Sequence, residues 1–579
     1  MGQSDTVTGQ GCARAETTGS GRRPVIEQQP YSGRQPGHGA RIQWPDLWSL
    51  GALVIAAIVV APILAVLWIA FNPADNIWPH LLATSLPRYL GNSLLLMAAT
   101  GVLTAMVGTG AAWLVVMYRF PFADVLQWAL LLPLAIPAYI GAYALVDFLE
   151  YSGPVQTGLR ALFGWHSARD YLFPEIRSRG SAILVLSAAL YPYVYLMART
   201  AFRDQSVGVL EVSRALGSGP WRSFFRVGLP LARPAIAAGV AIVMMEAASD
   251  FGTVEFFAVQ TLTTGIFSVW LEASNAGGAA QIAMVILGLV FLLVALEKAS
   301  RARIRFFRTT QRQAPIVRRQ LGRLGGFLAM LLCLVPFAAG FVLPVSVIGW
   351  HALENAGIWA DPALYRALWT TVWVGGTAAV LTVAGGVFLV YGVRLSGHRL
   401  PGYVLPVTTI GYAAPGAVLG IGLLIPLAGL DHRLADAIEA LTGHDPGLLL
   451  TGSAFAIILA YFVRFFAIAQ GAADAAMGRI SPSLPMASRS LGQTSGGTLW
   501  RVHLPLIRGS VATALLLVFV DSVKELPATL LLRPFNFNTL ATRVYDQASL
   551  ENLGQASPAA MIIILVGFMA VLLLARTSK

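Results

Sequence analysis

The chain has 579 residues, of which 56% are hydrophobic and only 12% are charged, and its mean hydropathy is +0.68. Soluble domains carry roughly 25% charged residues, so this composition excludes a soluble protein and indicates an integral membrane protein. The net charge of +12 does not indicate nucleic-acid binding, because the arginines lie mainly in short segments between apolar runs, as they do in cytoplasmic loops.

The chain divides by composition into four parts. Residues 1–43 are rich in Gly, Gln, Arg and Ser and contain no apolar run. They lack the hydrophobic region of a cleavable signal peptide, so we expect a disordered cytoplasmic tail. The remainder is expected to form a first membrane half at 44–297, a basic cytoplasmic linker at 298–323 and a second membrane half at 324–579.

Apolar runs of membrane-spanning length recur along both halves. A spanning helix needs about 20 mostly apolar residues. By that measure the sequence predicts twelve transmembrane helices, six in each half, and therefore an all-α integral membrane protein. The predicted spans are 49–71, 92–117, 124–148, 181–201, 231–252, 278–297, 325–350, 369–393, 402–428, 449–471, 509–532 and 556–576.

The charges of the connecting segments predict which side of the membrane each one faces. The linker 298–323 holds nine Lys and Arg residues, whereas 253–277 holds none. Basic residues near span ends are retained on the cytoplasmic side, which places both termini, the linker and the segments 202–230 and 472–508 inside. The segment 149–180 fits this rule less well, because it carries four arginines and falls outside.

The two halves are internal repeats. An offset of 275 residues aligns 213–233 with 488–508, and ten of the 21 positions are identical without a gap. Six spans separate the copies, so both lie on the same side of the membrane. The halves are therefore expected to be parallel repeats related by a pseudo-twofold axis along the membrane normal.

Acidic residues occur at equivalent places in the fifth predicted span of each half. The offset pairs Glu246 with Asp521 and Asp250 with Glu525. Each half has two acids four residues apart, which predicts that they share one helical face. An acid in the hydrocarbon costs roughly 2.5–3.5 kcal/mol, so these residues should avoid lipid. They either line a translocation pathway, together with Lys524, or bond to the backbone and to Lys524 at the interface between the halves.

The sequence contains no motif that indicates an enzyme. Cys12 and Cys333 do not make a disulfide framework or a cysteine metal site. None of the three lysines, at 298, 524 and 579, follows a glycine, so the chain has no P-loop for ATP. We expect no catalytic, cofactor-binding or metal-binding residues, and any ATP hydrolysis must reside in a separate subunit.

The repeated cytoplasmic segment resembles a motif of a known family. Residues 211–233 read EVSRALGSGPWRSFFRVGLPLAR. The run from Glu211 to Gly217, followed by Val-Gly-Leu-Pro ending at Pro230, is similar to the EAA loop of permease subunits of ATP-binding-cassette (ABC) importers. The copy at 486–508 keeps Gly492 and Leu-Pro but has Met486 where the family usually has Glu, which puts a salt bridge from this loop in doubt.

The resemblance implies that both loops dock on ATPase subunits. Each loop is expected to be a short helix, a turn and a second piece along the membrane surface. Gly217 and Gly492 would allow the turn, and Pro230 and Pro505 would begin the next helix. The residues expected to couple to the ATPase are Glu211, Arg214, Gly217, Trp221, Leu229, Pro230, Arg489, Gly492, Trp500, Leu504 and Pro505.

Over the whole chain, the sequence resembles two fused permease halves, as in iron(III) importer permeases. Members of the wider family carry thiamine, phosphonates or polyamines, and these solutes remain alternatives. The resemblance implies two copies of an ABC ATPase subunit, an extracytoplasmic substrate-binding protein on the side of 253–277 and 533–555, and a location in the bacterial cytoplasmic membrane. The rival class is an ion-coupled secondary transporter, which also has parallel halves and buried acids but lacks such loops.

Overall fold

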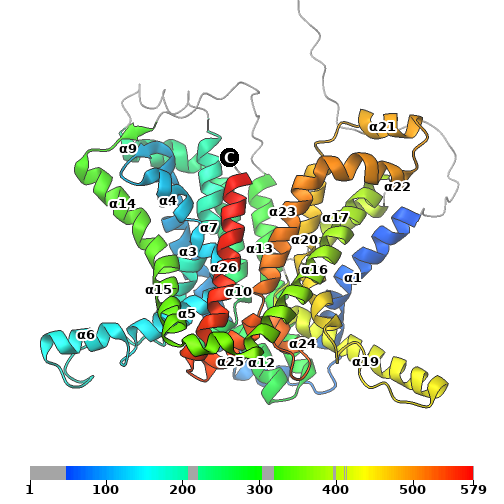
Figure 1. Cartoon of the computed structure of the whole chain (residues 1–579), viewed down its shortest axis with the longest axis horizontal. Helices are drawn as coiled ribbons and strands as arrows, with labels where there is room; N and C mark the ends of the chain where they lie inside the picture. The colour runs from blue at the N-terminus through cyan, green and yellow to red at the C-terminus, as the bar shows by residue number, and fades with distance from the viewer. Residues whose placement is uncertain are drawn as a thin grey trace, which may run out of the picture. The chain divides into compact units, whose positions relative to one another are not determined.

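The computed structural model describes residues 47–205, 219–302, 318–395, 400–409, 411 and 414–577. These residues are almost entirely helical (Figure 1). Eleven of their helices are long and apolar enough to cross a membrane, or twelve if the bent pair at 123–135 and 138–163 counts as one span. The all-α class and the predicted number of spans are thus confirmed. The predicted tail 1–43 and much of the linker 298–323 lie outside the described residues.

The first half begins with a long apolar helix and ends with another. Short helices at the lower end of Figure 1 connect several of its spans. Its elements are α1 (Leu47–Phe71), α2 (Trp78–Ala83), α3 (Leu86–Met117), β1 (Tyr118–Arg119), α4 (Ala123–Ala129), η1 (Leu132–Ala135), α5 (Ala138–Leu149), α6 (Pro154–Phe163), α7 (Arg179–Arg203), α9 (Pro220–Ser223), η2 (Phe224–Gly228), α10 (Leu229–Ser249), α11 (Gly252–Phe256), α12 (Leu262–Phe267), η3 (Ser268–Glu272) and α13 (Ala276–Ala302).

The second half repeats this order with small differences. Its short strand β2 pairs in parallel with β1, which ties the start of the second half to the first. Its elements are β2 (Arg319–Gln320), α14 (Arg323–Phe337), η4 (Ala338–Val342), α15 (Leu343–Glu354), η5 (Ala356–Ala360), α16 (Pro362–Leu395), α17 (Leu400–Thr408), α19 (Gly416–Thr442), α20 (Phe455–Met477), α21 (Ser483–Ser490), α22 (Ser495–Thr498), η6 (Leu499–His503), α23 (Leu504–Val523), α24 (Pro527–Leu532), α25 (Leu540–Ser549) and α26 (Leu553–Thr577).

The third span of each half is broken, so the prediction of continuous spans at 124–148 and 402–428 was wrong. In the first half the chain bends by 96° between 123–135 and 138–163. In the second half, α17 ends at Thr408 and α19 begins at Gly416. Pro137 and Pro415 precede α5 and α19 with ψ of 141° and 148°, outside the helical range. A proline offers no N–H and disfavours a helical residue before it, which explains both breaks.

The repeat seen in the sequence recurs in the hydrogen bonds of the two halves. In the first half, the Leu262 N–H donates to Ser93 Oγ at 3.0 Å, and in the second half the Leu540 N–H donates to Thr371 Oγ1 at 2.8 Å. Both bonds join the start of a short helix to the second span of the same half. Reciprocal threonine capping boxes also open both short helices, α12 and α25. The halves therefore share local structure as well as sequence.

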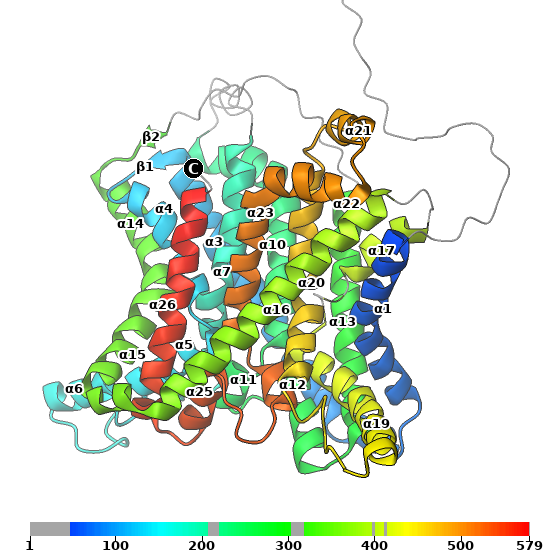
Figure 2. The same ribbon diagram turned by 45° about the vertical axis from the view of Figure 1, so that its right-hand side comes forward.

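The first helix of each half packs on the opposite half. In Figure 2, α1 lies beside α16 and α17 of the second half. Its Trp48 ring stacks on Phe388 at 4.9 Å between ring centroids and meets Tyr391 edge-on. Further along α1, the Pro62 carbonyl oxygen lies where a Cβ at Gly422 of α19 would sit. Only a glycine lets the two backbones approach this closely.

The helix that opens the second half makes the reciprocal contact. Its π-helical turn η4 places Gly340 against the carbonyl oxygen of Ala188 on α7. Farther along, His351 of α15 lies 2.9 Å from the carboxylate of Asp147 on α5. The first span of each half thus packs on the other half, an arrangement that we call the exchange of the first spans. Close backbone contacts at these spans tie the two halves together.

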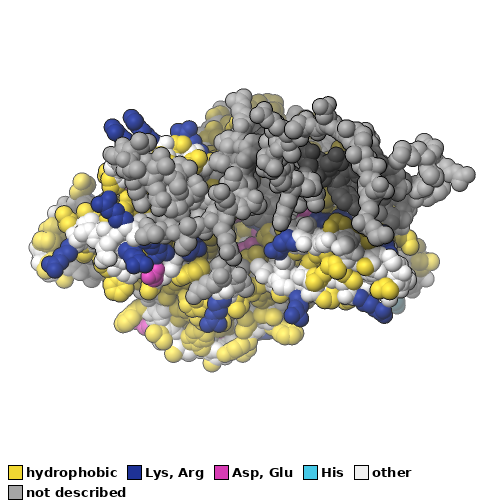
Figure 3. All heavy atoms as spheres, turned by 90° about the horizontal axis from the view of Figure 1, so that it is seen from above, with side chains coloured by type: hydrophobic (Ala, Val, Ile, Leu, Met, Phe, Trp, Pro, Cys, Tyr) yellow, Lys and Arg dark blue, Asp and Glu magenta, His cyan; other side chains and the backbone are white. Residues whose placement is uncertain are grey.

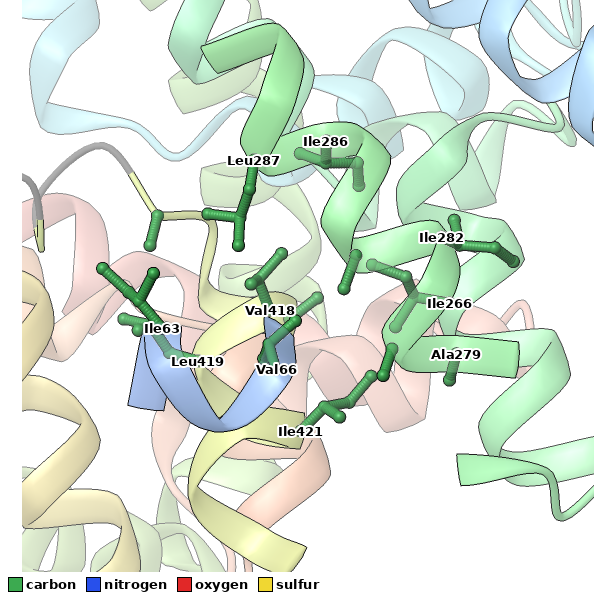
Figure 4. Close-up of a cluster of buried hydrophobic side chains, with 14 of the residues drawn as sticks. Ile63, Val66, Ile266, Ala279, Ile282, Ile286, Leu287, Val418, Leu419 and Ile421 are labelled. Carbon is green, nitrogen blue, oxygen red and sulfur yellow. The ribbon is translucent and has the colours of Figure 1, made fainter. Parts of the chain in front are cut away.

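The largest buried cluster shows how the exchange forms the core. Side chains from α1, α12, α13 and α19 interdigitate in it (Figure 4). Val66 and Ile421 belong to this cluster from different halves, and both are almost fully buried. These side chains are buried away from lipid and water, and dispersion and close packing stabilise their contacts.

Gly422→Val should weaken the packing of α1 against α19 of the second half. The added side chain meets the backbone of Pro62, which cannot move as a flexible side chain does, so we expect a loss of about 1–3 kcal/mol of stability. The control is Gly429→Val on the same helix, where a Cβ meets nothing within 4 Å. Thermal inactivation of the detergent-solubilised protein, followed by size-exclusion chromatography, checks this. Equal midpoints for the two variants would contradict the assignment.

Candidate functional site

Asp250 lies at a break in the chain and caps the helix that follows. The helix α10 ends at Ser249, and α11 begins at Gly252. One oxygen of the Asp250 carboxylate accepts the N–H groups of Thr253 and Val254 at 3.0 and 3.1 Å, and the other accepts the Thr253 hydroxyl at 2.9 Å. A carboxylate in this place satisfies amides that have no partner within the helix.

Glu525 does the same in the second half. Its carboxylate accepts the N–H groups of Ala528 and Thr529, both at 3.1 Å, and the Thr529 hydroxyl at 2.9 Å. The hydroxyls of Thr529 and Tyr461 lie 2.6 Å apart, and Arg464 Nη1 lies 3.5 Å from the carboxylate. Glu525 is only 4% exposed, so its charge is stabilised by these partners and not by water.

The prediction that each pair of acids shares one helical face was wrong. It assumed that the fifth span continues through Asp250 and Glu525, but the helices stop at Ser249 and Val523. The backbone at Asp250 is extended, with ψ of 136°, which turns the carboxylate towards α11. A proline at 527, two residues after Glu525, was the sequence signal for the break in the second half.

Asp521 and Lys524 form an ion pair within the second half. The Lys524 Nζ lies 2.8 Å from Asp521 Oδ1, three residues along the chain. The residue equivalent to Lys524 in the first half is Ser249, whose hydroxyl donates to the Met245 carbonyl oxygen. The lysine is therefore a departure from the repeat, and it gives the two halves different charges at this level.

A single cavity brings the five predicted pathway residues together. It has a volume of about 160 Å³ and is lined by both halves. The structure adds Arg464 of α20, which the sequence analysis missed although it is a lone charge inside a predicted span. The charged side chains lining the cavity are Glu246, Asp250, Arg464, Asp521, Lys524 and Glu525.

The same cavity contains hydrogen-bonding capacity that the protein does not use. The Tyr139 hydroxyl and Arg464 Nη1 are buried and have no hydrogen-bond partner among the described residues. Both residues line the cavity, with Tyr193 beside them. Buried polar groups are normally satisfied, so these atoms indicate that the cavity holds water or a polar solute.

The cavity does not have the composition of a metal site. Among the described residues, no group of three or more His, Cys, Asp and Glu side chains could hold a metal ion. Asp250 and Glu525 are engaged with backbone N–H groups, and Lys524 and Arg464 add positive charge. The arrangement suits passage of a polar solute and not tight coordination of a bare ion.

A larger cavity lies between α3, α5, α7 and the helix α14 of the second half. Its volume is about 730 Å³, but no charged residue lines it. The lining is aliphatic apart from Ser181, Ser187 and Tyr191. A passage for a charged solute needs polar groups, so the smaller cavity between the halves is the candidate site.

The loop 486–508 has the predicted helix and turn. The short helix α21 is followed by Gly492, which has φ of 82°. This left-handed conformation is available to glycine without steric cost. Ser488 Oγ and Thr498 Oγ1, 3.0 Å apart and buried, join α21 to α22, while Arg489 is exposed.

Pro230 and Pro505 lie in the first turn of α10 and α23, as predicted, but a π-helical turn joins each of these elements to a helix that begins earlier. The helix in the second half already starts at Ser495, and Leu504 and Pro505 follow the π-helical turn η6. The Leu504 N–H bonds to the Leu499 carbonyl oxygen, five residues back. Leu229 and Pro230 follow η2 in the same way. In a π-turn each backbone N–H bonds to the carbonyl oxygen five residues back instead of four. This shift by one residue accommodates a proline, which has no N–H to donate.

The first loop is described only from residue 219 onward. Glu211, Arg214 and Gly217 lie outside the described residues. Trp221 stacks on Phe225 with ring centroids 6.1 Å apart, and Trp221 is 76% exposed. Trp500 of the second loop is 72% exposed. Both loops thus present an aromatic side chain at the same end of the bundle (Figure 1).

Comparisons with known proteins agree with this architecture. Residues 100–306 match the family described as "Binding-protein-dependent transport system inner membrane component". The chain is 25% identical to the Fe(3+)-transport system permease protein FbpB 2 of Haemophilus influenzae over 84% of this chain and 89% of the relative. It is 22% identical to the ferric transport system permease protein FbpB of Actinobacillus pleuropneumoniae, over 91% and 78%.

Shorter relatives match as well. The molybdenum transport system permease protein ModB of Escherichia coli is 27% identical over 32% of this chain and 81% of its own length. A protein of that size corresponds to about one half of this chain, in keeping with the internal repeat. Residues 100–306 are thus similar to the inner-membrane permease components of binding-protein-dependent transport systems.

Proposed function

We propose that the chain is the membrane-spanning subunit of an ATP-driven importer that carries iron(III) into the bacterial cytoplasm. The support for iron is the extent of the likeness. Relatives named for Fe(3+) or ferric transport match 84–91% of this chain, whereas the relatives named for molybdenum and sulfate match 31–33%. Thiamine, phosphonate and polyamine transport remain alternatives within the same family.

The energy for transport comes from separate ATPase subunits. None of the three lysines of the chain follows a glycine, so a P-loop is absent from the sequence. Two equivalent loops, 211–233 and 486–508, call for two copies of the ATPase. These loops also favour an ABC importer over an ion-coupled secondary transporter.

The exposed apolar side chains of the loops are the docking surface for those subunits. In the second loop Met486, Leu491 and Trp500 are all more than half exposed. Gly492 lets this loop fold back, and the buried Ser488–Thr498 contact holds its shape. Closure of the ATPase subunits would then move α21 together with α23, since the helix from Ser495 to Val523 is continuous through the π-turn.

The charge of the loop-bearing end supports a cytoplasmic location for it. Seen from above, the described part of this face carries many Lys and Arg side chains and few acids (Figure 3). Arg222, Arg226, Arg489 and Arg501 belong to the two loops. Basic residues are usually retained on the inner side, which supports a cytoplasmic position for the loops, and the binding protein would then deliver solute at the opposite end.

The polar cavity between the halves is the proposed passage. Both halves contribute acids to it, and the Tyr139 hydroxyl and Arg464 Nη1 have no hydrogen-bond partner among the described residues. A rocking motion between the halves would open it alternately to the two sides. Selectivity for the solute then resides mainly in the binding protein, because the cavity has no metal-ligand cluster among the described residues.

Trp221→Ser combined with Trp500→Ser should release the ATPase without unfolding the permease. Exposed aromatic anchors at interfaces contribute about 2 kcal/mol or more each, so we expect the Kd for the ATPase to rise more than tenfold. Co-purification and titration in nanodiscs measure this. The control is Phe535→Ser, an exposed side chain at the opposite end of the bundle. Unchanged ATPase binding by the double variant would remove the docking assignment.

Glu246→Gln combined with Asp521→Asn should abolish most iron uptake while leaving assembly with the ATPase intact. The two amides keep the shape of the cavity but remove one charge from each half, which leaves Lys524 without its ion-pair partner. Uptake of radioactive iron by proteoliposomes that contain the full complex is the measurement. The matched control is Glu354→Gln, an exposed acid outside the cavity. Uptake equal to that of the control would exclude the cavity as the essential passage.

A further inference from the structure

At the end of the bundle opposite the coupling loops, each half extends an arm sideways. In Figures 1 and 2, α6 runs outward at the lower left, almost at right angles to the spans. The last part of α19 leaves the bundle on the other side (Figure 1). Both arms follow the broken third span of their half, so they occupy related positions in the repeat.

The first arm, residues 154–173, has one apolar and one polar face. Val155, Leu159 and Leu162 recur at intervals of three and four residues and so share a face of α6. Thr157 and Arg160 lie towards the opposite side. Leu162 is 76% exposed, whereas Val155 and Leu159 are partly buried, so the rest of the protein leaves the outer end of this face uncovered.

The first arm is nevertheless firmly folded. The Tyr171 hydroxyl donates to Gln156 Oε1 at 2.6 Å and accepts from Arg160 at 3.0 Å. The Trp165 ring stacks between Phe163 and Tyr171, with centroids 4.8 Å from each. The exposed apolar face is therefore a property of an ordered structure.

The return turn of this arm is also ordered. Asp170 accepts the backbone N–H groups of Ser167 and His166, both at 2.8 Å. These two hydrogen bonds, that of Ser167 foremost, hold the pKa of the Asp170 carboxyl below its usual value. The turn is thus fixed by its own residues without help from a partner.

The second arm, residues 427–442 of α19, shows the same division. Its apolar stripe consists of Leu427, Leu430, Leu434, Ile438 and Leu441. Leu441 is 86% exposed. The polar residues of the arm that face away from this stripe are His432, Arg433, Asp436 and Glu439.

The second arm is anchored by a buried acid. Asp431, fully buried, accepts the N–H groups of Leu449, Leu450 and Thr451 at 2.8 to 3.1 Å. This ties the loop that follows α19 back onto the helix. Each amphipathic arm therefore has its own set of contacts that keeps it folded.

We propose that both arms lie in the headgroup layer of the bilayer, with their apolar stripes pointing into the acyl chains. Amphipathic helices in this position bury one face about 5–10 Å into the boundary between headgroups and acyl chains. Trp165 and Tyr171 of the first arm are residues typical of that interface. A bilayer surrounds both halves, so it accounts for equivalent arms on opposite sides of the bundle.

The charges of the arms favour lipid over a protein partner of fixed charge. The first arm carries Arg160 and Arg169 against Asp170 and is net positive, whereas the second is net negative, because Arg433 stands against Asp431, Asp436 and Glu439. The apolar stripe is the feature that the two arms share, so zwitterionic lipid suffices to bind both. This inference does not depend on the solute or on the direction of transport.

Spin labels on single cysteines test the proposal. In a chain carrying Cys12→Ser and Cys333→Ala, Leu162→Cys and Leu441→Cys place the label on the apolar stripes. Thr157→Cys and Glu439→Cys, on the polar faces of the same arms, are the matched controls. The labelled proteins are placed in phosphatidylcholine nanodiscs, and accessibility to oxygen, which concentrates in hydrocarbon, is compared with accessibility to a water-soluble nickel chelate.

We expect the ratio of oxygen to nickel accessibility to be several-fold higher at positions 162 and 441 than at 157 and 439. Size-exclusion chromatography of each labelled variant verifies that the protein is folded. Equal ratios on both faces would show that the arms stand in water and would overturn the proposal. Shielding of 162 and 441 only after a binding protein is added would also overturn it and would assign the stripes to that protein.

Discussion

The exchange of the first spans is the constraint on which the rest of the structure depends. Gly422 and Gly340 allow backbones of opposite halves to touch at Pro62 and Ala188. These contacts are stabilised by dispersion at close range. Helices in lipid need such contacts, because the hydrophobic effect alone does not drive them together. Each half is therefore held by a helix of the other, which resists separation of the halves.

The polar cavity is a consequence of that arrangement. It lies between the halves, and each half closes its own side with a broken span and a carboxylate-capped short helix, α11 or α24. Asp250 and Glu525 therefore have a structural role in addition to any contact with solute. Lys524 has no counterpart in the first half, so the two sides of the cavity differ in charge although their backbones repeat.

Features that depend on composition and spacing could be predicted from the sequence. The number of spans, the repeat and the pairing of Glu246 with Asp521 all follow from apolar length and a constant offset. Gly492 and its turn also follow, because a left-handed backbone requires glycine. Pro137 and Pro415 were sequence signals for the breaks in the third spans. An apolar run by itself does not tell whether it forms one helix or two.

Other features could not be predicted from the sequence. Periodicity tells which face of a helix is apolar but not which helix covers it. The packing of α1 and α14 on the opposite halves could therefore not be predicted. The role of Asp250 depends on where α10 ends, and a spacing of four residues suggests a shared face only if the helix continues. Pro505 lies in the first turn of α23, where proline is usual, but the sequence did not reveal the π-turn η6 that joins α23 to the preceding helix.

Reconstitution tests the central claim most directly. The purified chain is placed in proteoliposomes, alone or together with its ATPase and binding protein, and iron accumulation is followed with and without ATP. Accumulation against a gradient should require the ATPase and ATP, and it should be unaffected by collapse of ion gradients. Accumulation by the chain alone, driven by a proton or ion gradient, would contradict the account.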